Sequence, residues 1–311
     1  MKFFYPAKKE NLTHISRDGR VYQLDSFWKM YELYKELDKK YSKLIQITDE
    51  ASINSKFLLT FHTRDFVESL LTGKNREALI ESSGVFWQPW LPIVCYNEAL
   101  ATKSAVLNLI NGDNLSILIS DVGHHTTPFQ AFGFGPINSL GTAIYDLKKQ
   151  ISKKKIVVLD LDVHLGNGFS FINGENIYTF DLWNKKLEKW PINDGNSNYR
   201  DFKVNNAKEY FEILQKTLIE IETLKPDIVI YYSGADVINT DRMGGIKGFD
   251  LRKFKEREGL VFKSLKKLSC KVLLSFGGGY INYKGKSVIK SKKKLIDAHL
   301  FSVESAIKNL A

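Results

Sequence analysis

The residues best suited to chemistry follow an apolar run in the middle of the chain. Ile156 to Leu159 are strand formers, and Asp160, Asp162 and His164 come after them at alternate positions. A continuous Ile/Val/Leu run is typical of a strand buried on both faces of a parallel sheet. Alternate residues of an extended chain point to the same side, so these three side chains are expected to face one site. Two carboxylates and an imidazole together predict a metal site.

Three other predicted strands also end in unusual polar or glycine-rich sequence. They run over residues 116–120, 228–232 and 271–276, and are followed by His124 and His125, by Asp236, and by Tyr280, respectively. Each signal alone is weak, because a histidine pair is usually a loop feature and an aspartate often caps a helix. Parallel strands present their C-terminal ends at one edge of a sheet, where open α/β sheets bind ligands. Their joint occurrence therefore predicts one site.

The residue types at this predicted site are suited to hydrolysis. Asp162, His164 and Asp236 would supply three ligands, and a catalytic zinc takes about three protein ligands while leaving a position for water. Such a metal lowers the pKa of its water and polarises a carbonyl. A neighbouring histidine can act as general base and then general acid. A tyrosine hydroxyl can stabilise an oxyanion, so the set predicts hydrolysis of an amide or related acyl bond.

Helical segments separate these strands. They are expected over residues 26–41, from 63 onward, and over 96–109, 139–151, 207–224, 250–268 and 295–310, with further short strands at 2–5, 57–61 and 177–182. In the first helix the apolar side chains share one face, and the lysines and glutamates are expected on the other. The alternation predicts an α/β fold with a mostly parallel central sheet flanked by helices and right-handed crossovers. Because no linker or repeat is evident, a single domain over residues 1–311 is expected.

The composition is that of a basic globular protein. The formal net charge is +10, from 45 Lys+Arg against 35 Asp+Glu. The lysine clusters favour a solvated surface over a nucleic-acid site, since no nucleic-acid-binding motif accompanies them. Cys95 and Cys270 are the only cysteines, which fits a reducing compartment. No apolar segment reaches the length of a signal-peptide core or a membrane span, so a soluble, cytoplasmic protein is predicted.

The chain resembles the zinc-dependent histone deacetylase superfamily, on the arginase/deacetylase fold. Five motifs carry the resemblance: Gly-His-His at 123–125, Asp-Leu-Asp-Val-His-Leu-Gly-Asn-Gly at 160–168, Ser-Gly-Ala-Asp at 233–236, Asp-Arg-Met-Gly-Gly at 241–245 and Gly-Gly-Gly-Tyr at 277–280. They occur in the order of the family and span most of the chain. Within the superfamily the chain is similar to class IV, through Phe-Asp-Leu-Trp-Asn at 180–184 and Trp-Pro at 190–191.

The resemblance implies a role for each residue of the site. Three would bind zinc: Asp162, His164 and Asp236. His125 would be the general base and acid, His124 its electrostatic neighbour, and Tyr280 the group that polarises the substrate carbonyl. Asp160 would orient His124 and contribute to a structural K⁺ or Na⁺ site, while Asn167 would orient His125. Four residues would line the acyl-lysine channel: Gly133, Phe134, Trp190 and Gly278.

The function that the resemblance implies is removal of acetyl or longer, including fatty, acyl groups from lysine side chains of proteins or peptides. The same metal chemistry would also serve acetylpolyamines or another small N-acyl amine. The aromatic stretch Phe86, Trp87 and Trp90 is either the rim of an apolar pocket or a packed loop. A non-enzymatic basic scaffold or nucleic-acid binder would leave the site unexplained. An arginase-like pair of manganese ions is disfavoured by Leu165 and Asn167, and the oligomeric state stays open.

Overall fold

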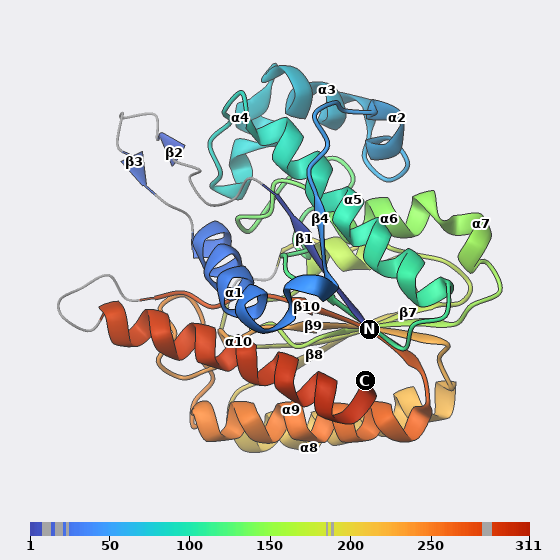
Figure 1. Ribbon diagram of the computed structural model, residues 1–311, viewed down its shortest axis with the longest axis vertical. Coiled ribbons are helices and arrows are strands. Elements are labelled where there is room, and N and C mark those ends of the chain that lie inside the picture. The colour runs from blue at the N-terminus through green and yellow to red at the C-terminus, as the bar shows by residue number, and fades with distance from the viewer. Residues whose placement is uncertain (8–13, 16–20, 23–24, 185, 188–189, 282–287) are drawn as a thin grey trace.

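The computed structural model describes the chain except for residues 8–13, 16–20, 23–24, 185, 188–189 and 282–287 (Figure 1). Its centre is an eight-stranded sheet in the order β4-β1-β5-β10-β9-β6-β7-β8. All neighbouring strands are parallel. The strands are β1 (Lys2–Pro6), β4 (Ile45–Thr48), β5 (Leu115–Leu118), β6 (Ile156–Asp160), β7 (Ile177–Asn184), β8 (Tyr199–Val204), β9 (Ile228–Ser233) and β10 (Lys271–Phe276). The predicted parallel α/β fold is confirmed.

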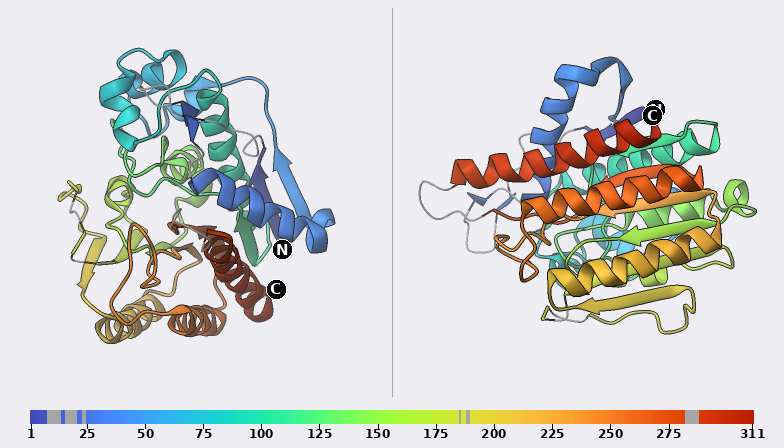
Figure 2. Two further views of the ribbon diagram at one scale, coloured as in Figure 1. Left: turned by 90° about the vertical axis from the view of Figure 1, so that its left-hand side faces the viewer. Right: turned by 90° about the horizontal axis from the view of Figure 1, so that it is seen from below.

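Helices cover both faces of this sheet (Figures 1 and 2). One face carries α5 (Leu91–Ile110), α6 (Ser139–Asp146) and α7 (Lys148–Ile151), and the other carries α1 (Asp25–Tyr41), α8 (Ala207–Leu224), α9 (Leu251–Leu268) and α10 (Val288–Leu310). Successive strand residues alternate between the two resulting cores: Leu159 packs on the side of α8 and α9, and Val158 on the side of α5 and α6. Every residue of β6 is buried, as its unbroken apolar run predicts.

Smaller elements complete the described chain. They are the antiparallel pair β2 (His14–Ile15) and β3 (Val21–Tyr22), the short helices α2 (Ser55–Leu58), α3 (Arg64–Thr72) and α4 (Arg76–Leu79), and the 3₁₀ turns η1 (Ser42–Leu44), η2 (Glu81–Ser83) and η3 (Asn167–Phe171). The short helices α2 to α4 pack on α5 in a third apolar core. Within the described residues, no helix has the length and apolar character needed to cross a membrane.

Two local predictions are wrong. Residues 57–61 were expected to form a strand, but α2 forms there because the Asn54 side chain accepts the Lys56 backbone N–H and caps a helix. Residues 199–201 were expected to belong to a loop, yet they begin β8. This edge strand is largely half-buried, and β4 at the other edge is half-exposed as well, so neither shows the continuous apolar run of a central strand.

The aromatic stretch before α5 is a packed loop in this structure. The Trp87 indole N–H donates to the Leu70 carbonyl oxygen at 2.7 Å. Trp90 meets the ring of Phe27 edge-on, with centroids 6.3 Å apart. Val85 is fully buried in the third core, against which both indole rings pack. These contacts use the indole rings for packing, which favours the packed-loop interpretation over a pocket rim.

Candidate active site

Three predicted ligands come together at the C-terminal edge of the sheet. Asp162, His164 and Asp236 each place one ligand atom within 4.8 Å of the others. The His164 Nδ1 atom lies 3.0 Å from Asp162 Oδ1 and 3.1 Å from Asp236 Oδ2. The first two residues follow β6 and the third follows β9, and these strands are hydrogen-bonded neighbours. Adjacent parallel strands thus bring together residues that lie more than seventy positions apart in the chain.

Backbone groups hold the two carboxylates in place. The Val163 N–H donates to Asp236 Oδ1 at 3.0 Å, and the Gly278 N–H donates to Asp162 Oδ2 at 2.5 Å. A Cβ atom at Gly278 would lie 1.8 Å from Asp236 Oδ2, so only glycine fits there. Gly278 therefore packs directly against both carboxylates, while its predicted place in the channel stays a prediction. The Met243 carbonyl lies 3.3 Å from His164 Nε2 and orients the imidazole.

The charges in this cluster fit a divalent cation. Burial and the charge of Asp162 raise the pKa of Asp236 to about 7. Burial alone would lower the pKa of His164, but hydrogen bonds to Asp162 and Asp236 raise it well above its usual value. The two buried carboxylates require a shared positive partner, and an imidazole nitrogen faces both of them. Together these side chains provide the oxygen and nitrogen donors that zinc accepts.

The two adjacent histidines differ in their partners. His124 Nδ1 lies 2.9 Å from Asp160 Oδ2, whereas His125 Nδ1 lies 3.0 Å from Asn167 Oδ1. Burial opposes protonation of His124, but the charges of Asp160 and Asp162 outweigh it and raise its pKa to about 9. Burial, together with the neighbouring imidazoles, lowers the pKa of His125 well below its usual value. One histidine is therefore cationic and the other neutral at physiological pH.

Aromatic side chains surround the neutral histidine. The Trp190 ring meets the His125 ring edge-on at 4.2 Å between centroids, and stacks with Phe132 at 5.7 Å. Gly133 has φ +57°, and a Cβ atom there would lie 1.9 Å from His125 Cδ2. Phe134 follows it and reaches towards Tyr280, with ring centroids 5.9 Å apart. Gly133, Phe132 and Trp190 thus lie next to His125, and Phe134 lies next to Tyr280; the acyl-lysine channel itself stays a prediction.

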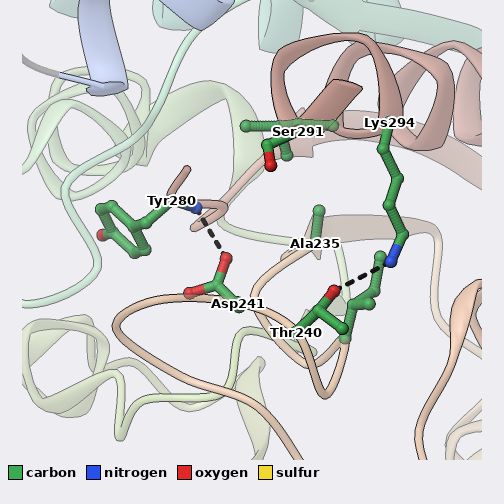
Figure 3. Close-up of a pocket in the computed structure, with 8 residues that line it drawn as sticks. Ala235, Thr240, Asp241, Tyr280, Ser291 and Lys294 are labelled. Atoms are coloured by element: carbon green, nitrogen blue, oxygen red, sulfur yellow. Dashed lines mark hydrogen bonds between the residues drawn. The ribbon is translucent and has the colours of Figure 1, made fainter. Parts of the chain in front are cut away.

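Tyr280 lies on the far side of the ligand cluster. Its ring centroid is 6.3 Å from that of His164, and its backbone N–H donates to Asp241 Oδ2 at 2.7 Å (Figure 3). The ring points away from Lys294, and both residues line a small cavity of about 50 Å³. Burial and the charges of Asp162 and Asp236 raise the pKa of the Tyr280 phenol well above its usual value. The hydroxyl therefore remains a hydrogen-bond donor.

Sequence reasoning missed Lys29. The lysines of α1 were expected on its polar face, but Lys29 is fully buried and its Nζ donates to the Gly277 carbonyl oxygen at 2.6 Å. That nitrogen also lies 5.5 Å from the centroid of the Tyr280 ring. The burial of Lys29 could have been inferred from its position one turn before Leu33, a core residue on the same face of the helix. Lys29 anchors the start of the glycine run that leads to the tyrosine.

Asp181 is a buried carboxylate to which the sequence analysis assigned no role. Its Oδ2 accepts hydrogen bonds from the Gly166 N–H at 2.7 Å and the Tyr199 hydroxyl at 2.6 Å. Within the described residues, its Oδ1 is buried without a hydrogen-bond partner. Burial and the charge of Asp160 raise its pKa well above the usual value. Its position in β7 beside Asp160 of β6 explains that electrostatic coupling.

Known proteins similar to this chain include plant histone deacetylases. Histone deacetylase 2 of Arabidopsis thaliana is 22% identical over 251 residues, which are 76% of this chain and 64% of that protein. Histone deacetylase 8 of Arabidopsis thaliana is 32% identical over 127 residues, which are 40% of this chain and 33% of that protein. The chain therefore spans less than two thirds of the length of these curated relatives.

Solved structures share the fold over nearly the whole chain. The acetylpolyamine aminohydrolase from Burkholderia pseudomallei has a TM-score of 0.73 at 14% identity and covers 98% of both chains. The HD domain of HDA15 has a TM-score of 0.73 at 16% identity, over 99% of this chain and 93% of that one. The family model of the histone deacetylase domain matches residues 23–295. With the site geometry, this match shows that the chain belongs to the histone deacetylase domain family.

Proposed function

We propose that the protein is a zinc-dependent deacylase that hydrolyses the amide bond of acyl-lysine side chains. The observation that carries the proposal is the buried cluster of Asp162, His164 and Asp236, with ligand atoms within 4.8 Å of one another, between a neutral His125 and a protonated Tyr280. Asp162, His164 and Asp236 would hold the zinc ion. When bound there, zinc would acidify a water molecule and polarise the substrate carbonyl.

The chain's own residues provide the proton transfers. With its Nδ1–H directed at Asn167 Oδ1, His125 keeps Nε2 free to take a proton from the attacking water. The same nitrogen then gives this proton to the lysine amine as the C–N bond breaks. His124, which is cationic beside Asp160, stabilises the negative charge that develops nearby. The Tyr280 hydroxyl donates a hydrogen bond to the oxyanion.

The channel walls support an acyl-lysine substrate. Phe132, Phe134 and Trp190 form apolar surfaces next to His125 and Tyr280. Such walls suit the methylene groups of a lysine side chain and an acyl chain longer than acetyl, whereas a polyamine cation needs carboxylates along its path. We therefore favour protein or peptide substrates over acetylpolyamines.

We also propose that the chain is a class IV member. The run at 180–184 forms the end of β7, next to the strand that carries Asp160. The amide of Asn184, the last residue of this run, donates to the Gly245 carbonyl oxygen at 2.8 Å. This bond links the run to the Asp-Arg-Met-Gly-Gly turn at 241–245. Trp190, from the Trp-Pro pair, contacts His125. The contacts of the 180–184 run with the 241–245 turn and of Trp190 with His125 support the class IV proposal.

A substrate panel with a matched variant tests the proposed reaction. The zinc-loaded protein is expected to hydrolyse acetyl-, octanoyl- and myristoyl-lysine peptides faster than acetylputrescine or acetylspermidine. In Tyr280→Phe, kcat should fall by about 10²–10³-fold because an oxyanion donor is lost, while zinc content stays unchanged. Faster turnover of the acetylpolyamines would favour the small-amine alternative. A zinc-loaded protein that hydrolyses none of these amides would refute deacylation.

A structural monovalent cation is a second part of the proposal. Among the described residues Asp181 Oδ1 is buried without a hydrogen-bond partner, and this oxygen together with the neighbouring charge of Asp160 suits a K⁺ or Na⁺ ion. At a hundredfold excess over its Kd, such an ion would stabilise the fold by about 2.7 kcal/mol. The melting temperature should therefore be several degrees higher in KCl than in tetramethylammonium chloride of equal ionic strength. Asp181→Asn should reduce this difference, and equal melting temperatures of the unaltered protein in both salts would contradict the cation site.

A further inference from the structure

We infer that Arg257 of α9 is a positioning residue that fixes the spacing of the two loops carrying the predicted metal ligands. The inference rests on the zinc site proposed above and adds a residue on the far side of those loops. Arg257 is fully buried, although it lies in the middle of a lysine-rich helix. No motif from the sequence includes it, and Glu258, the next residue in the chain, is fully buried as well.

The guanidinium group donates to both ligand loops at once. Its Nη1 lies 3.0 Å from the Leu161 carbonyl oxygen and 2.9 Å from the Gly234 carbonyl oxygen. Its Nη2 lies 3.0 Å from the Ser233 hydroxyl oxygen. Leu161 stands between Asp160 and Asp162, and Gly234 is two residues before Asp236. A single side-chain nitrogen thus joins the loop after β6 to the loop after β9.

Glu258 holds the guanidinium in that orientation. Its Oε1 accepts from Arg257 Nε at 2.9 Å and lies 2.8 Å from Nη2. The same oxygen accepts a hydrogen bond from the Tyr231 hydroxyl at 2.5 Å. Nε and Nη2 of the planar guanidinium therefore bind the carboxylate, while Nη1 binds the two loops. A lysine has one nitrogen and could not make both sets of contacts.

Stability alone does not account for this arrangement. A buried ion pair is often no more stabilising than apolar residues of the same volume. Two backbone donors of the loop after β6 also bind the segment that carries Asp236: the Val163 N–H donates to Asp236 Oδ1, and the Leu161 N–H donates to the Tyr232 carbonyl oxygen. A shift of either loop would change the distance between Asp162 and Asp236. We therefore expect the effect of Arg257 to appear in metal affinity.

Cobalt(II) binding tests this assignment, because its absorption spectrum reports ligand geometry without turnover. The metal-free protein is titrated with Co²⁺ as unaltered chain, as Arg257→Lys and as the double variant Arg257→Met/Glu258→Met, which removes both buried charges. Substitution of residues that hold metal ligands in place typically weakens metal binding by about 10–100-fold. Both variants should therefore bind Co²⁺ about 10–100-fold more weakly, with an altered visible spectrum. Melting of the metal-free proteins, with and without Co²⁺, reports affinity even where a variant is destabilised.

Tyr231→Phe is the matched control. It removes a hydrogen bond to Glu258 within the same cluster and leaves the donors to Leu161 and Gly234 in place. Its melting temperature should fall while its Co²⁺ affinity and spectrum match those of the unaltered chain. If Arg257→Lys and the double variant also keep that affinity and spectrum, the positioning role is wrong. If the unaltered chain itself binds no Co²⁺ or Zn²⁺, the proposed zinc site is wrong.

Discussion

Asp236→Asn is expected to abolish zinc binding and deacylation while making the metal-free protein more stable. Asp236 is fully buried and faces His164 Nδ1 at 3.1 Å, so its carboxylate would be one of three protein ligands. An amide is a much weaker ligand. Because metal-assisted hydrolysis gains several kcal/mol from the ion, we expect activity to fall by about 10³-fold or more.

Although Asp236→Asn is expected to abolish activity, it is expected to increase the stability of the metal-free protein. Burial and Asp162 raise the pKa of Asp236 to about 7, so the ionised carboxylate is less favourable in the metal-free fold than in the unfolded chain. A raised carboxyl pKa contributes stability at low pH that is lost as the pH rises through about 7. Asparagine carries no such charge and still offers an oxygen to the Val163 N–H. Above pH 7 the metal-free variant should therefore be more stable than the unaltered metal-free protein.

Two measurements separate these effects. Thermal melting at pH 8 in the presence of a chelator should show a higher midpoint for Asp236→Asn, and added Zn²⁺ should raise the midpoint of the unaltered protein only. Asp227→Asn is the matched control, since Asp227 is exposed just before the opposite end of the same strand, β9. It should retain zinc binding and activity. A zinc-induced shift of normal size in Asp236→Asn would contradict the ligand assignment.

The second large effect is expected for His125→Ala. The neutral imidazole would transfer a proton in both halves of the reaction, and general acid–base groups contribute about 10²–10⁴-fold. We therefore expect kcat to fall by that factor. Zinc content should not change, because the described ligand cluster consists of Asp162, His164 and Asp236. The loss thus differs from that of Asp236→Asn, in which metal and activity disappear together.

Asn167→Ala provides a graded comparison. It leaves His125 in place but removes the oxygen 3.0 Å from Nδ1 that favours the tautomer with a free Nε2. Its kcat should lie between those of the unaltered protein and His125→Ala. Steady-state kinetics on an acyl-lysine peptide, with zinc measured in each sample, checks both variants. If His125→Ala keeps more than a tenth of the normal kcat, another group must be the general base.

The sequence alone determined the fold class and which residues meet at the site. Strand formers in a continuous run indicate a strand buried on both faces, as β6 is. Because parallel strands share a C-terminal edge, polar residues after β5, β6, β9 and β10 had to lie close together. Ligand chemistry is a property of residue type, so Asp162, His164 and Asp236 could be proposed as metal ligands without coordinates.

Only the tertiary structure decided which charged side chains are buried and what they contact. The partners of Lys29, Asp181 and Arg257 include groups from distant parts of the chain, and a local pattern cannot distinguish such residues from exposed ones. The same holds for His124 and His125. They are neighbours of one residue type, yet one is paired with a carboxylate from β6 and the other with an amide from η3. Their opposite pKa shifts arise from burial and from these long-range partners, which exist only after the chain has folded.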